Sequence, residues 1–164
     1  MAKKPKVLII GHARHGKDTL ANYMRDVLDY RVADSSRRAA EIFLFELLRV
    51  KYGYVDFEQC YQDRVNHRAE WYEAICEFNT PDKTKLARNI MSNSDVYVGM
   101  RDRTEIEACK AASIFDAVIW VDACQRLPLE PKSSFNIDQS LADFVVDNNG
   151  DLDQFYDAIE GIER

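Results

Sequence analysis

A stretch near the start of the chain contains the glycines and the lysine that typically bind phosphate groups. It reads VLIIGHARHGKDTLANYM over Val7–Met24, and its Gly11-x-x-x-x-Gly16-Lys17 spacing is that of a P-loop. Such glycines let the backbone wrap around a phosphate chain with its N–H groups pointing inward, and the lysine reaches the β- and γ-phosphates. An apolar run precedes the motif and a helical pattern follows it, which is the context that the motif needs. We therefore expect ATP to bind at Gly11, Ala13, Arg14, His15, Gly16, Lys17, Asp18 and Thr19.

The residues around Lys17 leave two points open. A Ser or Thr usually follows the lysine and ligates Mg²⁺, but here Asp18 takes that place and Thr19 comes next. We predict Thr19 as the magnesium ligand, with Asp18 acting on the metal through water as the alternative. His12, Arg14 and His15 could equally be solvated or shape the loop, and contact of Arg14 with phosphate is left open.

The elements that must position this motif follow from the apolar pattern. Short apolar runs predict strands at Val7–Ile10, Tyr30–Ser36, Asp95–Met100, Ala117–Asp122 and Phe144–Asp147. Helices are predicted over about 17–28, 37–53, 57–78, 81–93, from a capping pattern of Asp102 and Glu105 to about 112, and after the cap Asp151. Strands that alternate with helices predict a three-layer α/β/α fold with a parallel sheet of about five strands. The 164 residues fit one domain, with a helical insertion at about 54–94 and a lid-like loop at about 123–137.

Ligands of such sheets bind beyond the carboxyl ends of the strands, so the residues that follow each strand are candidates for the site. Arg101 directly follows a buried strand, and its guanidinium could grip a phosphate bidentately; an ion pair with Asp102 or Glu105 is the alternative. Asp34 could orient an acceptor, and Asp122 could hold metal-bound water. Both could also be plain polar strand ends.

The predicted insertion and the late loop supply further cations. On a continuous helix, Arg64, Arg68 and Trp71 share one face, with His67 at its edge, which indicates an anion-lined cleft or a basic end that frays into solvent. Arg126 and Lys132 in the loop could close over transferring phosphates, although Lys132 could equally lie on a plain surface loop. Lys17, Arg101 and Arg126 are the predicted catalytic residues.

Composition limits the class of protein. The chain is 46% hydrophobic and 30% charged, and its net charge of −6 argues against a large nucleic-acid footprint. The four cysteines lack a C-x-x-C pair, which favours reduced thiols and a cytoplasmic location. No apolar run is long enough to span a membrane, so we expect no membrane partner. The oligomeric state is open, a homodimer included.

Four segments carry a resemblance to a family: GHARHGKDT, DRVNHRAEWYEAICEFNT, DVYVGMRDRTEIEA and DFVVDNNGDLDQFYDAI. They resemble the deoxynucleoside monophosphate kinases of tailed bacteriophages, over nearly the whole chain. The resemblance implies a P-loop nucleotide-kinase fold and γ-phosphoryl transfer from ATP, with Mg²⁺, to a deoxynucleoside 5'-monophosphate in the host cytoplasm. It also implies that Arg101 and Arg64 or Arg68 hold the acceptor phosphate. The chain departs from the family in lacking two closely spaced lid arginines, because Arg126 stands alone.

Two other functions stay open at this point. The chain also looks similar to a phage group that phosphorylates 5-hydroxymethyluracil within DNA, and only then would nucleic acid be a partner. An enzyme acting on intact DNA should carry a broad basic surface, of which the net charge gives little sign. The third hypothesis is a regulator that binds a nucleotide and does no chemistry.

Overall fold

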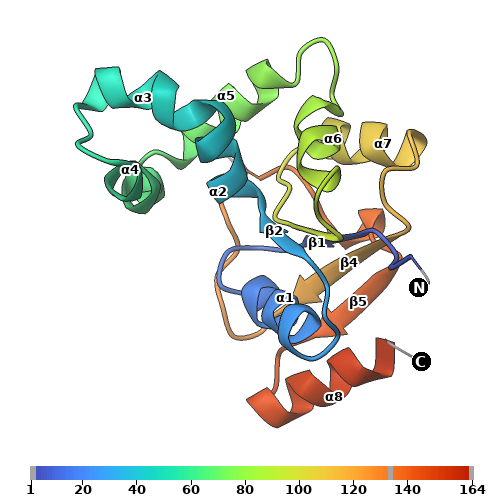
Figure 1. The fold of residues 1–164 in the computed structure, drawn as a ribbon. Helices are drawn as coiled ribbons and strands as arrows, with labels where there is room; N and C mark the ends of the chain where they lie inside the picture. Colours follow the sequence, from blue (N-terminus) through green and yellow to red (C-terminus); the bar gives the residue numbers. More distant parts are fainter. Residues whose placement is uncertain (1–2, 133–134, 163–164) are drawn as a thin grey trace.

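The computed structural model describes residues 3–132 and 135–162 and shows a parallel five-stranded sheet in the order β2-β3-β1-β4-β5 (Figure 1). The strands are β1 (Val7–Ile10), β2 (Val32–Asp34), β3 (Val96–Val98), β4 (Ala117–Asp122) and β5 (Phe144–Asp147). The α-helices are α1 (Lys17–Asp26), α2 (Ser35–Ala39), α3 (Phe45–Tyr52), α4 (Phe57–Asp63), α5 (Arg68–Phe78), α6 (Lys85–Met91), α7 (Arg103–Ala111) and α8 (Leu152–Ile162). A π-helical turn, η1 (Ala40–Leu44), joins α2 to α3, and 3₁₀ turns lie at η2 (Arg64–Asn66) and η3 (Gln139–Leu141).

Successive side chains of the strands point to opposite faces of the sheet, and both faces of the central strands β1, β3 and β4 are buried. Val7 and Ile9 of β1 pack in one apolar cluster with residues of α1 and α8, whereas Leu8 and Ile10 pack in the other with residues of α2 to α7. Figure 1 shows α1 and α8 on one side of the sheet and α6 and α7 on the other. The predicted three-layer α/β/α fold with five parallel strands is therefore confirmed.

The register of the sheet brings the ends of the strands to one edge. Ile10 at the end of β1 lies opposite Trp120 of β4, and Asp34 at the end of β2 lies opposite Val98 of β3. The segments that follow β1, β2, β3 and β4 therefore start from the same edge, as expected for a parallel sheet.

The predicted continuous helix over 57–78 is wrong. It ends at Asp63 and restarts at Arg68, because His67 between them has φ −133° and ψ 33°, outside the helical region. The carboxylate of Asp63 accepts hydrogen bonds from the side chains of Asn66 (2.7 Å) and His67 (3.0 Å). These local bonds stabilise the break, since polar side chains compete with the helical hydrogen-bond pattern.

Two other predicted boundaries shift for similar reasons. The second strand ends at Asp34, because its carboxylate caps a helix by accepting from the Arg37 amide at 3.1 Å. The predicted 81–93 helix begins only at Lys85, after a turn in which the Asp82 carboxylate accepts from the Thr84 amide at 2.9 Å. The pattern of Asp102 and Glu105 predicts the start of α7 correctly, because Asp102 stands at its N-cap, but the Asp102 side chain makes no capping bond.

All four cysteines are free thiols, as the sequence predicts. Within residues 3–132 and 135–162, no helix has both the length and the apolar character to span a bilayer.

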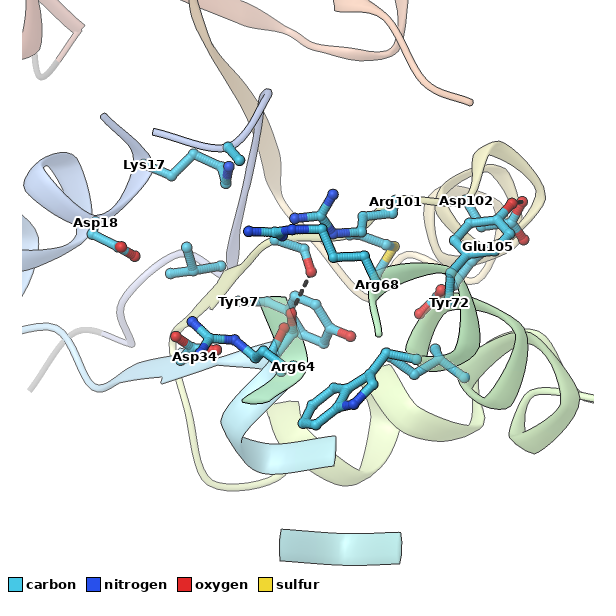
Figure 2. Close-up of a pocket in the computed structure, with 18 of the residues that line it drawn as sticks. Lys17, Asp18, Asp34, Arg64, Arg68, Tyr72, Tyr97, Arg101, Asp102 and Glu105 are labelled. Carbon is cyan, nitrogen blue, oxygen red and sulfur yellow. Dashed lines mark hydrogen bonds between the residues drawn. The ribbon is translucent and has the colours of Figure 1, made fainter. Parts of the chain in front are cut away.

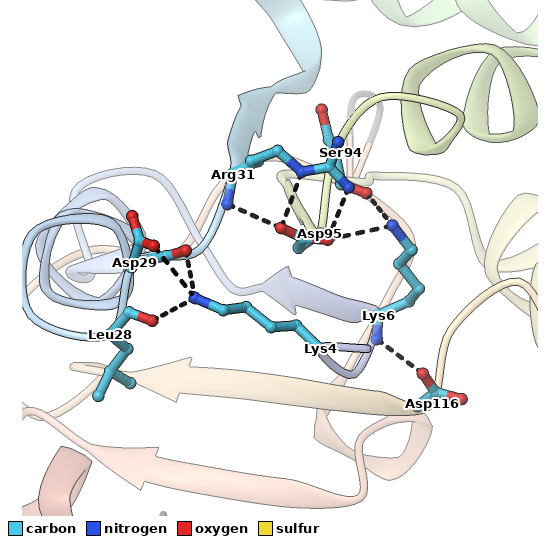
Figure 3. A network of polar contacts seen from close by, with 8 residues as sticks. All are labelled: Lys4, Lys6, Leu28, Asp29, Arg31, Ser94, Asp95 and Asp116. Atoms are coloured by element: carbon cyan, nitrogen blue, oxygen red, sulfur yellow. Dashed lines mark hydrogen bonds and ion pairs between the residues drawn. The ribbon is translucent and has the colours of Figure 1, made fainter. Parts of the chain in front are cut away.

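The edge of the sheet opposite the strand ends is held by one buried carboxylate (Figure 3). Asp95, just before β3, accepts from the backbone amide of Arg31 (2.9 Å), from its guanidinium (3.0 and 3.1 Å) and from the Lys6 ammonium (3.2 Å). The segments before β1, β2 and β3 thus meet at a single side chain. The bonds from Arg31 are the largest cause that holds the pKa of Asp95 well below its usual range.

Replacing this carboxylate should destabilise the fold. Asp95→Asn should lower the free energy of unfolding by about 1–3 kcal/mol at pH 7, because it removes the charge that pairs with Arg31 and Lys6. Since the pKa is lower in the folded state, the carboxylate's contribution is fully present above the unfolded pKa of about 3.9 and is lost as the pH falls through the folded value. Urea unfolding of both proteins at pH 7 and pH 3 should therefore give a difference that shrinks in acid.

The control is Asp26→Asn, which removes an exposed ion pair with Arg25 and should cost little. Equal stability of the Asp95→Asn variant and the wild type at pH 7 would contradict this account.

Candidate functional site

The loop between β1 and α1 is packed closely against its neighbours at its two glycines. Gly11 has φ +149°, and a Cβ built on it would lie 2.6 Å from the backbone oxygen of Val121 in β4. Gly16 has φ +112°, and its Cβ would lie 2.6 Å from the side-chain nitrogen of Asn148. Larger residues would therefore push the loop away from the strand ends, where the sequence places a phosphate.

The start of α1 supplies donors to the same place. The amides of Lys17, Asp18 and Thr19 lie in the first turn, where helical N–H groups have no intrahelical acceptor. The positive end of the helix dipole adds to their attraction for anions. The Lys17 ammonium lies over the loop and donates to the backbone oxygens of Gly11 (2.8 Å) and His12 (2.9 Å).

A cavity of about 340 Å³ begins at this loop and extends between α5 and α7 (Figure 2). Of the sequence-predicted site residues, it is lined by Ala13, Arg14, Lys17, Asp18, Asp34, Arg64, Arg68, Trp71 and Arg101. Figure 2 shows Lys17 and Asp18 at one end, the guanidinium groups of Arg68 and Arg101 in the middle, and Glu105 at the other end.

Three arginines from different elements meet on this cavity. Arg64 lies 3.9 Å above the ring of Tyr61 and donates to the Tyr61 carbonyl at 2.9 Å, which orients its guanidinium. Arg68 comes from the first turn of α5, after the break in the helix, and Arg101 comes from the segment after β3. The break therefore does not separate Arg64 from Arg68, since both line the cavity.

A carboxylate that sequence reasoning missed lies between two of these arginines. Glu130 forms a hydrogen-bonded ion pair with Arg101 and lies 3.7 Å from Arg68, and its side chain is only 7% exposed. The alternative pairing of Arg101 with Asp102 or Glu105 is not the one seen. No local pattern in the sequence links residue 130 to residues 68 and 101, so only the folded chain reveals the contact.

Two histidines of the β1–α1 loop hold the late loop, defined here as residues 123–132, against the site. His15 is fully buried; its Nδ1 accepts from the Ala123 amide (3.1 Å) and its Nε2 donates to the Pro128 carbonyl (3.0 Å). His12 accepts from the Glu130 amide at 3.0 Å, which places Glu130 beside the arginines. Sequence reasoning left these histidines as loop-shaping or solvated, and the contacts show that they shape the loop.

The other predicted residues lie off the cavity wall. Gly11, Gly16 and His15 belong to the loop backbone and its packing, and Thr19 is not among the lining residues. The Nε of Arg126 donates to the Asn148 carbonyl at 2.7 Å, away from the cavity. Lys132 is exposed, and residues 133–134 of the predicted 123–137 loop lie outside the described residues.

Two aspartates at strand ends differ in position. Asp34 lines the cavity and accepts from the hydroxyl of Tyr61 at 3.1 Å. Asp122 does not line it; its carboxylate accepts from the Cys124 amide at 3.0 Å and from the side chain of Asn149 at 3.2 Å. Asp122 thus holds the start of the late loop.

The crowding of cations lowers the pKa of two of them. Burial, and next the charge of Arg101, lower the pKa of Lys17 to about 8. Burial, and next Arg101, also lower the pKa of Arg68. A bound anion would relieve both effects, because an opposite charge favours the charged form of a cation.

The donor set at the loop fits Mg²⁺. Asp18 offers a carboxylate on the cavity beside Lys17, and Thr19 offers a hydroxyl on the same turn. Among the described residues, no group of three or more His, Cys, Asp or Glu could hold a metal by itself. Mg²⁺ needs no such cage, since it is usually held by one or two protein groups together with phosphates and water.

Comparison with known proteins supports the fold. No protein-family profile matches the chain, and no curated protein matches it in sequence. Among solved structures, it is similar to shikimate kinase from Bacteroides thetaiotaomicron, with a TM-score of 0.54 and 11% identity over 97% of this chain and 96% of that one. It is also similar to shikimate kinase from Aquifex aeolicus (TM-score 0.51, 14% identity, 96% and 93% covered). TT1252 from Thermus thermophilus gives a TM-score of 0.50 at 17% identity, with 98% and 97% covered. At these identities the likeness establishes the three-layer kinase fold and nothing finer.

Removing the Glu130 carboxylate should make the arginines better anion ligands. In the free protein Glu130 competes with an incoming anion for Arg101, so Glu130→Gln should bind inorganic phosphate roughly 3–10-fold more tightly than the wild type. Isothermal titration calorimetry at low ionic strength measures this affinity. Glu107→Gln, an exposed change on α7, is the matched control, and equal affinity in all three proteins would contradict the competition.

Proposed function

We propose that this protein transfers the γ-phosphoryl group of ATP to a deoxynucleoside 5'-monophosphate. The observation that supports this most is a single cavity with a phosphate-binding loop and Lys17 at one end and three arginines beyond it. A triphosphate on the loop would place its terminal phosphate toward the arginines. An acceptor that itself carries a phosphate would then fill the cationic middle of the cavity.

The donor end fits ATP with Mg²⁺. The backbone amides of the loop and of the first turn of α1 would hold the phosphates, and Lys17 would leave the Gly11 and His12 carbonyls to contact the β- and γ-phosphates. Asp18 and Thr19 are the residues that would hold the metal, directly or through water. Mg²⁺ neutralises phosphate charge when it is bound.

The acceptor end fits a phosphate group. Arg64, Arg68 and Arg101 offer planar donors that suit a dianion, and Glu130 already occupies Arg68 and Arg101 as an internal anion. In this proposal the predicted insertion at about 54–94, which contains α4, α5 and α6, binds the acceptor, and the late loop acts as the lid. Asp34, on the cavity wall, would orient the acceptor.

The reaction needs positioning and charge neutralisation more than acid–base chemistry. An oxygen of the acceptor's phosphate forms a bond to the γ-phosphorus, and the bond from that phosphorus to the bridging oxygen breaks. The electron pair leaves with ADP, and the acceptor becomes a diphosphate. Lys17 and Arg101 would offset the charge that spreads over the transferred group, which is where catalysis of this reaction mainly lies.

The direct test offers the protein ATP and Mg²⁺ with each deoxynucleoside monophosphate and, separately, duplex DNA that contains 5-hydroxymethyluracil. We expect a labelled γ-phosphate to appear on a monophosphate, and Lys17→Ala to lower kcat by about 10²–10³-fold, since it removes a preorganised cation. Lys85→Ala, an exposed change on α6, is the control for folding and activity.

The other outcomes separate the alternatives. Label on DNA alone would replace the proposal with a DNA kinase. ATP that binds without transfer to any acceptor would favour a non-catalytic regulator.

Arg101 should act mainly on the acceptor. Arg101→Ala removes a charged hydrogen-bond donor from the cavity and should raise KM for the monophosphate by about 10–100-fold, with a much smaller change in KM for ATP. Initial-rate kinetics with each substrate varied in turn measure the two constants. Arg103→Ala is the matched control, because Arg103 pairs at the surface with Asp138 (2.8 Å) and Glu107 (3.6 Å). An unchanged acceptor KM would remove Arg101 from the acceptor site.

A further inference from the structure

The end of the cavity farthest from Lys17 carries chemistry that phosphoryl transfer does not use. Figure 2 shows Tyr72, Asp102 and Glu105 together there, beyond Arg68 and Arg101. All three line the cavity, as do the apolar side chains of Ile75 and Met100. Transfer to a phosphate oxygen requires no acid or base at this distance from the loop, so these groups need another explanation.

Two polar atoms on the cavity wall have no partner within the described parts of the chain. Glu105 is 3% exposed, and its Oε1 makes no hydrogen bond. Trp71 is 5% exposed, and its Nε1–H is likewise unpaired. An unmet buried polar group costs about 1–3 kcal/mol, so two of them on one cavity are best explained as groups that a ligand satisfies.

The neighbouring carboxylate is satisfied and thus differs from Glu105. Asp102 accepts from the hydroxyl of Thr104 (2.5 Å), the amide of Asn136 (3.1 Å) and the hydroxyl of Tyr72 (3.2 Å). These bonds lower the pKa of Asp102 against the opposing effect of burial. Asp102 is therefore the ionised member of the pair.

Glu105 is held as a neutral acid. Burial, and next the charge of Asp102, raise its pKa to about 8, while the side-chain amide of Asn79 and the charge of Lys83, in the turn before α6, lower it. The other titratable groups facing it are Cys109 on its own helix, Tyr72 and Cys76 on α5, and Tyr97 on β3. At neutral pH the group thus carries one O–H donor and one carbonyl acceptor side by side.

We propose that Glu105 hydrogen-bonds the base of the acceptor nucleotide, and that the accepted base is thymine, cytosine or adenine. The proposal rests on the proposed function and adds the substrate class to it. Each of these bases presents a donor beside an acceptor, which a carboxylic acid matches with two hydrogen bonds. Guanine can present the same pair through O6 and N1–H, but a neutral acid then leaves its N2–H without a partner, and its two adjacent donors, N1–H and N2–H, suit an ionised carboxylate instead. The Trp71 N–H is available to a ring carbonyl or nitrogen, and Ile75 and Met100 supply apolar contacts for the faces of the ring.

The length of the cavity supports this assignment. When the acceptor's phosphate lies at Arg68 and Arg101, its other end must extend toward Glu105 or back toward Lys17, where ATP binds. A sugar phosphate without a base would leave Glu105 and Trp71 unpaired. Sites built to hydrogen-bond a substrate discriminate strongly against analogues that lack the matching groups.

The test compares Glu105→Gln with Glu105→Leu. Glutamine keeps a donor and an acceptor of the same shape and cannot ionise, whereas leucine keeps the volume and has neither. We expect Glu105→Gln to stay within a few-fold of wild-type kcat/KM for the best monophosphate at pH 7, and Glu105→Leu to lose about 10–100-fold, mainly through KM. Binding of 2-deoxyribose 5-phosphate, measured by competition, should be unchanged in both. Glu107→Gln on the exposed side of α7 is the control.

The pH dependence gives a second, independent arm. For each pH, kcat/KM for the best acceptor is divided by the association constant of 2-deoxyribose 5-phosphate, so that effects on phosphate binding cancel. This ratio should fall above pH 8 in the wild type and stay constant in Glu105→Gln. A parallel Lys17→Arg series identifies any part of the fall that comes from Lys17 instead of Glu105.

The outcomes distinguish this inference from the proposed function. Transfer to no monophosphate would overturn the proposed function itself. Transfer that is fastest to dGMP, Glu105→Leu kinetics equal to wild type, or an equal loss for the monophosphates and 2-deoxyribose 5-phosphate would overturn the role of Glu105 alone.

Discussion

The close packing of the β1–α1 loop against the neighbouring strand ends is the constraint on which the site depends. Gly11 leaves no room for a side chain beside Val121, and Gly16 leaves none beside Asn148. The loop is therefore fixed at the edge of the sheet, with the first-turn amides of α1 free of intrahelical acceptors. Because the sheet is parallel, β2 and β3 deliver Asp34 and Arg101 to that same edge. The loop thus determines where the cavity begins, and the strand order determines what faces it.

A second consequence concerns charge. Lys17 and four arginines, Arg14 among them, share one cavity, and the proximity of Arg101 helps to lower the pKa of Lys17. Two unit charges 4 Å apart interact by about 4 kcal/mol at an effective dielectric constant near 20, so such a cluster opposes folding unless anions offset it. Glu130 supplies one negative charge, placed by the His12 contact with its backbone amide. The free protein therefore holds an internal carboxylate at the site that the proposed acceptor phosphate would occupy.

The fold can be predicted from the sequence because most of the strands are short apolar runs. All five predicted strands form. The phosphate-binding loop and Arg101 are also predictable from the sequence, since each lies just beyond a buried strand, although β3 ends at Val98 and not at the predicted Met100. The pairing of Glu130 with Arg101 could not be predicted from the sequence. The two residues are 29 positions apart, and the path of the loop that brings them together depends on His12 and His15. The break at His67 is equally hidden, since it depends on a local competition between the Asp63 side chain and the helix. Arg126 looks like a lid cation in sequence, yet the Asn148 carbonyl takes its donor.

The chemical character of the cavity wall changes from one end of the cavity to the other. Its polar groups change from an ammonium at Lys17, through guanidinium groups, to a neutral acid at Glu105 beside an ionised, fully bonded Asp102. At one end of α7, three hydrogen bonds lower the pKa of Asp102, whereas burial and the charge of Asp102 raise the pKa of Glu105. A molecule with a dianionic group at one end and an uncharged, hydrogen-bonding ring at the other has only one favourable orientation in such a gradient. That orientation places the anionic end toward the loop, where phosphoryl transfer from a bound triphosphate would have to occur.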